Sequence, residues 1–100
     1  MRLRWSRRAV LDLVEIGDYI VADDPVAARR WGEKLRLKAA RAAAAPAAGR
    51  RVPELGRDDV REVFLRSYRI VYRIVTGAIV VLTIVEGHRR LPAIDPDRGP

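Results

Sequence analysis

REVFLRSYRIVYRIVTGAIVVLTIV, residues 61–85, is the stretch that decides the fold, and its pattern predicts three antiparallel strands. From Tyr68 to Val75 the side chains alternate between two unlike faces, one carrying Tyr and Ile and the other Arg and Val. Thr76-Gly77 can turn the chain, because glycine accepts positive φ at little steric cost. Residues 78–85 are almost uniformly apolar, which is typical of a central strand covered on both faces.

Two amphipathic helices precede these strands. Residues 1–5 alternate as a short first strand, and Ser6 is a suitable N-cap for a helix with apolar positions at helical spacing. Asp24 and Pro25 predict the start of a second helix, which Pro46 ends. The acidic residues of the first helix, Asp12, Glu15 and Asp18, are expected on its solvated face. The order β-α-α-β-β-β predicts an α+β fold, a twisted antiparallel sheet with a helical hairpin packed on one face.

One domain is expected over residues 1–91, with a Pro-rich flexible tail over residues 92–100. The chain has no cysteine, which excludes disulfides and Cys-ligated metal sites, and we expect neither a metal nor a cofactor. Residues 1–14 lack the uninterrupted apolar region of a secretory signal, and the longest apolar run is too short to span a bilayer. A cytoplasmic protein without membrane contact is therefore expected.

The charge is strongly basic, with 20 Lys and Arg against 13 acidic residues and a formal net charge of +7. Such a balance favours an anionic partner, either nucleic acid or an acidic protein. All but two of the basic residues are Arg, so biased codon usage remains an alternative origin of part of the excess.

Six arginines are the candidate partner-binding residues. Arg69 and Arg73 share a strand face, and Arg89 and Arg90 lie where the last strand ends, a common location for contact residues. The complete predicted set is Arg61, Arg66, Arg69, Arg73, Arg89 and Arg90. Exposed ion pairs with neighbouring acids are the structural alternative for several of them.

The chain resembles the RelE/ParE superfamily of bacterial type II toxins. The matching segments are WSRRAVLDLVEIGDYI, DDPVAARRW, GRRVPEL, VREVFLRSYRIVYRIV and the closing VEGHRR. They cover about nine-tenths of the chain, and the YRIVY core is the most specific of them. The resemblance implies a helical hairpin on a twisted sheet, and a hetero-oligomer with an antitoxin encoded beside the toxin. A ParD-like antitoxin with an acidic amphipathic segment would fit this basic chain.

The superfamily has two activities, and the residues favour one of them. RelE-like members cut mRNA on the ribosome, whereas ParE-like members poison DNA gyrase. RNA cleavage needs a base, an acid and cations, and arginine stays protonated. Here Glu62 and Phe64 stand where cations would be needed, and no tyrosine follows Arg90. The resemblance therefore favours a ParE-like gyrase inhibitor with no catalytic residues.

Two alternatives stay open at this point. One is a ribosome-dependent mRNA endonuclease, in which Arg69, Arg89 and His88 would be the catalytic residues. The other is an inactive module that binds only the antitoxin. His88 is the single histidine and has only Glu86 as a nearby carboxylate, so a catalytic role is the less favoured interpretation. Trp5 fits either the core or an antitoxin groove.

Overall fold

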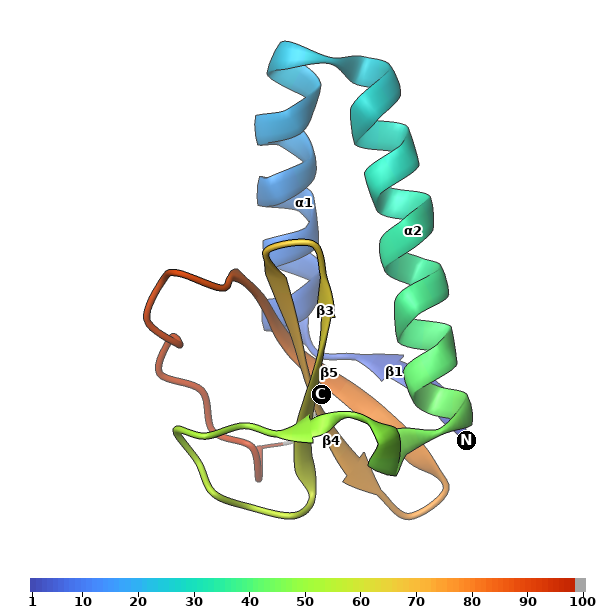
Figure 1. Cartoon of the computed structure of the whole chain (residues 1–100), viewed down its shortest axis with the longest axis vertical. Helices are drawn as coiled ribbons and strands as arrows, with labels where there is room; N and C mark the ends of the chain where they lie inside the picture. Colours follow the sequence, from blue (N-terminus) through green and yellow to red (C-terminus); the bar gives the residue numbers. More distant parts are fainter. Residues whose placement is uncertain (99–100) are drawn as a thin grey trace.

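The computed structural model describes residues 1–98 and confirms an α+β fold in which a helical hairpin lies against a five-stranded sheet (Figure 1). The helices are α1 (Arg7–Asp23) and α2 (Pro25–Ala44), and a short 3₁₀ turn covers Pro46–Ala48. The strands are β1 (Arg2–Trp5), β2 (Arg50–Arg51), β3 (Val60–Leu65), β4 (Tyr68–Val75) and β5 (Ala78–Glu86). Their order across the sheet is β1-β5-β4-β3-β2.

The sheet is mixed, which corrects the expectation of antiparallel pairing throughout. Strands β2 to β5 pair antiparallel, but β1 runs parallel to β5, with Arg2 opposite Ala78 and Trp5 opposite Val81. This direction brings the chain to the middle of β5, where the Ser6 amide donates to the carbonyl of Val81 at 2.9 Å. Helix α1 can then cover the second half of β5. The short strand β2 was also missed, because two arginines carry no strand signal of their own.

The two helices begin where the capping residues predict. The hydroxyl oxygen of Ser6 accepts the amide of Ala9 at 3.0 Å, which satisfies a free amide of the first turn of α1. Asp24 is the single residue between the helices: its carboxylate accepts the amides of Val26 and Ala27 at 3.0 and 3.2 Å. With Pro25 next in the chain, this cap makes the tight antiparallel hairpin visible in Figure 1.

The core on the helix side of the sheet follows the predicted alternation. Ile70 and Tyr72 are fully buried, and Trp31 of α2 meets Tyr68 edge-to-face with 5.4 Å between ring centroids. Trp5 packs against the same cluster, so its place is the core rather than a groove.

The opposite face of the sheet is covered as well. A second apolar cluster is built on Val52, Val60, Val71, Val80 and Leu82. Leu55 from the β2–β3 connector and Leu91 and Ile94 from the C-terminal segment pack against it. The arginine-bearing face was expected to be open to a partner, and this expectation is wrong: covering segments exclude water from its valines.

The predicted tail, residues 92–100, is attached to the sheet over the part that the structure describes. The Arg73 guanidinium donates to the carbonyl of Pro96 at 3.0 Å, and Arg57 bonds Asp97 at 2.9 Å. The domain boundary at residue 91 and the flexibility of the tail stay predictions, and residues 99 and 100 lie outside the described range. Within residues 1–98, no helix is long and apolar enough to cross a bilayer.

Candidate functional site

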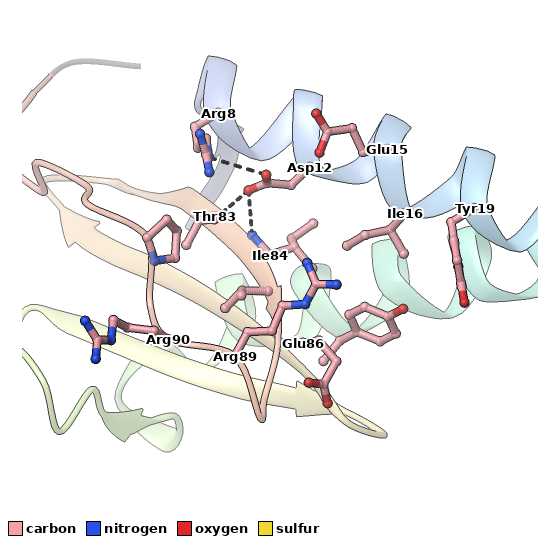
Figure 2. Close-up of a pocket in the computed structure, with 13 residues that line it drawn as sticks. Arg8, Asp12, Glu15, Ile16, Tyr19, Thr83, Ile84, Glu86, Arg89 and Arg90 are labelled. Carbon is pink, nitrogen blue, oxygen red and sulfur yellow. Dashed lines mark hydrogen bonds and ion pairs between the residues drawn. The ribbon is translucent and has the colours of Figure 1, made fainter.

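A groove opens between α1 and the end of β5. It has a volume of about 540 Å³ and combines three arginines with three carboxylates (Figure 2). Its lining residues are Arg8, Asp12, Glu15, Ile16, Tyr19, Tyr68, Thr83, Ile84, Val85, Glu86, Arg89, Arg90 and Pro92. We call this the α1–β5 groove.

The groove exists because β1 is shorter than β5. Strand β1 pairs with β5 only as far as Val81, so the outer edge of β5 beyond that residue has no neighbouring strand. Ser6 covers part of this edge, because its hydroxyl donates to the carbonyl of Leu82 at 2.9 Å. Asp12 covers the next part: its carboxylate accepts the amide of Ile84 at 3.1 Å. The remaining edge faces the groove.

Asp12 is buried at the base of the groove, which corrects its assignment to a solvated helix face. Its carboxylate accepts the hydroxyl of Thr83 at 2.5 Å, and Arg8 lies 3.3 Å away, one helical turn earlier. Only 9% of the residue is exposed. With two donors on one oxygen and an ion pair on the other, this buried carboxylate fastens the helix to the strand.

Arg89 and Arg90 both line the groove, and their partner-binding role stays a prediction. Both side chains are exposed. Figure 2 shows Arg89 reaching into the space between β5 and α1, whereas Arg90 points to the other side. Within residues 1–98, neither side chain forms a hydrogen bond or an ion pair, in contrast to Arg8, which lies 3.3 Å from Asp12.

His88 lies on the turn after β5, where its side chain is 90% exposed. Its Nδ1 lies 2.8 Å from the carboxylate of Glu86, which also accepts the His88 backbone amide at 2.9 Å. These contacts, with the hydrogen bond from the His88 side chain as the main cause, lower the pKa of Glu86. The pair stabilises the turn. It does not by itself place a base, an acid and a phosphate-binding arginine around one phosphodiester.

Arg69 lies outside the groove, on the face of β4 that points away from the helices, inside a buried ion-pair network. Its Nε donates to Glu62 at 2.6 Å, and its two terminal nitrogens bind the carboxylate of Glu54 at 2.7 and 2.9 Å. Glu62 is also bound by Arg50 at 2.6 Å. The hydrogen bonds to Glu54 raise the pKa of Arg69, and the same contacts lower the pKa of Glu54 to about 2.

Arg73 and Arg61 are likewise engaged within the chain. Arg73 bonds Asp59 at 3.1 Å and lies 3.5 Å from Asp97. Asp59 is chiefly held by Arg57, whose hydrogen bonds lower the Asp59 pKa to about 2. Arg61 donates to two backbone carbonyls, those of Asp58 at 2.8 Å and Gly49 at 3.1 Å.

Arg66 is exposed on the β3–β4 turn, where its φ of 53° is a left-handed conformation. The six predicted arginines therefore do not form one patch. Arg69, Arg73 and Arg61 serve the sheet and its connectors, Arg66 stands alone, and Arg89 and Arg90 flank the α1–β5 groove.

The sequence suggested Glu62, Asp58 and Asp59 as ion-pair partners of Arg61 and Arg66, but in the structure Glu62 and Asp59 pair with Arg69 and Arg73 instead. Glu62 was noted as an unexpected residue in its strand, but its pairing with Arg69 depends on the β3–β4 register, in which Glu62 lies opposite Val71. No cluster of three or more His, Cys, Asp or Glu side chains that could hold a metal ion occurs among residues 1–98.

Comparison with known proteins identifies the family of this chain. The family model described as the ParE toxin of type II toxin-antitoxin system, parDE, matches residues 3–91. A curated sequence of Sinorhizobium fredii (strain NBRC 101917 / NGR234), named "Putative toxin Y4kP", is 38% identical over 96 residues, covering 93% of this chain and 95% of that protein. A solved structure titled "Chromosomal ParDE TA system from P. aeruginosa" superposes with a TM-score of 0.71 at 25% identity, over 86% of this chain and 95% of that one. The chain is a member of the ParE toxin family of type II toxin–antitoxin systems.

Proposed function

We propose that this toxin acts by binding rather than by catalysis: it inhibits DNA gyrase when free and is neutralised by a cognate ParD-like antitoxin. The observation that carries the proposal is the state of Arg69. A nuclease would use this arginine to stabilise charge on a phosphate, but here two carboxylates within 2.9 Å already neutralise it. Only 5% of the residue is exposed to solvent.

The other candidate catalytic residues support the same conclusion. Arg89 stays protonated and cannot act as a base. His88 lies on an exposed turn and has Glu86 as its partner. Cleavage of RNA needs a base, an acid and a charge-stabilising group that converge on one phosphate. The three residues named for that role do not converge, because Arg69 lies on the covered face of the sheet.

The antitoxin is proposed to meet the chain at the α1–β5 groove with an acidic amphipathic segment. Arg89 and Arg90 offer charge at the rim, and Ile16 and Tyr19 of α1 offer apolar surface beside it. Exposed charges of this kind mainly raise the association rate and weaken with salt. We therefore expect the Arg89→Ala/Arg90→Ala double variant to bind more slowly, while the already paired Arg73 contributes little.

A supercoiling assay tests the proposed target. The toxin is released from its antitoxin complex, refolded, and titrated into purified gyrase, ATP and relaxed plasmid. The expected result is loss of supercoiling with increasing toxin, and its recovery when the antitoxin is added back. Toxin inactivated by prior unfolding is the control for non-specific inhibition by a basic protein.

A translation extract tests the competing endonuclease. Codon-specific mRNA cleavage that disappears on His88→Ala, together with unaffected gyrase, would overturn the proposal in favour of a ribosome-dependent enzyme. Expression without growth arrest in cells lacking the antitoxin, combined with tight antitoxin binding, would instead indicate an inactive module.

A further inference from the structure

The solvent side of α1 carries an unusual row of apolar residues. Val10, Val14 and Val21 are 45%, 52% and 45% exposed, although the opposite side of the helix is well packed. They belong to a series with alternating steps of three and four residues, the spacing that places side chains on one helix face. The series, which we call the α1 seam, is Val10, Val14, Gly17 and Val21.

Gly17 makes the middle of this seam shallow. A Cβ atom added there would meet nothing within 4 Å outside the local helix backbone, so no other part of the chain fills this position. Glycine on a helix surface allows a second helix to approach closely, and costs stability where no such approach occurs. The residue is therefore easier to understand as half of a contact than as part of an isolated helix.

The seam is also symmetric about a point between Glu15 and Ile16. Reversing its direction places Val10 opposite Val21 and Val14 opposite Gly17. Each pairing is complementary, with valine on valine at the two ends and a valine over the space of a glycine at the centre. An antiparallel two-fold contact uses the same patch on both partners and requires this kind of self-complementarity.

The charge distribution of α1 agrees with that arrangement. Arg7 and Arg8 lie at its start, and Asp18 and Asp23 lie toward its end. In an antiparallel pair of helices, the basic end of each would lie beside the acidic end of the other, and the helix dipoles would also oppose favourably. A parallel pair would bring like charges together at both ends.

We propose that two copies of this chain associate through their α1 seams as a weak antiparallel homodimer. The contact would form a four-helix layer, since each α1 brings its α2 beside it (Figure 1). One narrow seam buries less surface than the roughly 1,200 Å² of a stable interface, so a dissociation constant of about 10–100 μM is expected. The proposal does not depend on the target of the toxin.

Sedimentation equilibrium of the purified chain from about 5 to 500 μM tests the association. The expected result is a rise in average mass toward twice 11.3 kDa, and an increase of at least about tenfold in the dissociation constant for Val14→Glu, which places a charge in both copies of the seam. Leu37→Glu on α2 is the matched control, because Leu37 is also 52% exposed but lies off the seam. A monomer at every concentration would overturn the proposal.

Cysteine cross-linking tests how the two α1 helices are aligned. The chain has no natural cysteine, so only the introduced cysteines can form disulfides. A mixture of the Val10→Cys and Val21→Cys proteins should form a disulfide-linked heterodimer under mild oxidation, because the antiparallel contact places these Cβ atoms together. Val10→Cys alone should link poorly, because its two copies would lie about 16 Å apart along the helices. Efficient linking of Val10→Cys alone would indicate a parallel contact, and protection of the seam by an antitoxin helix with no self-association would assign the face to that helix; either outcome rejects the antiparallel homodimer.

Discussion

Replacing Arg69 with methionine is the sharpest test of the buried network, because it removes the charge and keeps a long apolar side chain. Glu62 would be left fully buried with Arg50 as its remaining partner, and the Arg50 side chain is 58% exposed. Breaking a buried ion pair on one side costs about 3–5 kcal/mol. Since Arg50 continues to donate to Glu62, we expect the lower end, about 3 kcal/mol.

This loss is large beside the total stability of a domain of this size, about 5–15 kcal/mol. With a urea m-value of about 1.5 kcal/mol/M, the unfolding midpoint should fall by about 2 M. Urea unfolding followed by far-UV circular dichroism measures it. Arg90→Met, an exposed arginine treated in the same way, should change the free energy of unfolding by less than about 0.5 kcal/mol.

A double variant separates structural from functional loss. Glu62→Leu/Arg69→Met leaves no buried charge without a partner, and it should recover most of the lost stability. It should also retain antitoxin binding and gyrase inhibition if Arg69 serves only the sheet. The reasoning fails if Arg69→Met costs no more than Arg90→Met, or if the stable double variant has lost antitoxin binding.

Three further predictions follow from single contacts. Gly49→Ala should lower the free energy of unfolding by about 1–3 kcal/mol, because its Cβ would lie 2.2 Å from the Tyr72 hydroxyl. Gly17→Ala has open space at the new Cβ and should raise the free energy of unfolding by about 0.5–1 kcal/mol. Thermal unfolding of the two variants measures both changes. Asp12→Ala should cost about 1–3 kcal/mol in urea unfolding, because it removes the one oxygen that accepts from both the Thr83 hydroxyl and the Ile84 amide. The Glu54 pKa is lowered from 4.5 to about 2, so its contribution to stability is complete above about pH 4.5 and disappears as the pH falls toward 2. Solvent screening limits that contribution to about 1 kcal/mol, and Glu54→Gln should flatten the acid limb of the stability profile.

The sequence predicts the fold well where local signals act alone. Alternation in β4 separates two faces, Ser6 and Asp24 cap helices, and Gly77 turns the chain with a φ of 73°. These features depend on neighbours within a few residues, so the order of elements and the helix-side core could be derived. The direction of β1 could not, because it depends on which half of β5 the hairpin covers.

The candidate site was harder to predict, because the position of a charged residue in the sequence follows no regular spacing that would reveal its partners. Arg69 and Arg89 are alike in the sequence, yet one is buried between two glutamates and the other borders an open groove. What separates them is strand register and the path of the β2–β3 connector, both of which are long-range. Asp12 was misassigned for the same reason: its partners, Thr83 and Ile84, are more than 70 residues away along the chain.

Which arginines are paired within the chain says more about how a partner could bind than the net charge does. Acids within the chain hold Arg69, Arg73 and Arg57, so these three stabilise the β2–β3 connector and the C-terminal segment on the sheet. Of the six arginines predicted to bind a partner, Arg89 and Arg90 at the rim of the α1–β5 groove are therefore the two that we propose to contact it. If an antitoxin recognises only the net charge of the toxin, removing arginines from either face of the sheet should change the salt dependence of its association rate to a similar degree. If it recognises the α1–β5 groove, the association rate should lose its salt dependence in the Arg89→Ala/Arg90→Ala variant and keep it in Arg73→Ala. The slope of the association rate against salt concentration therefore distinguishes the two modes.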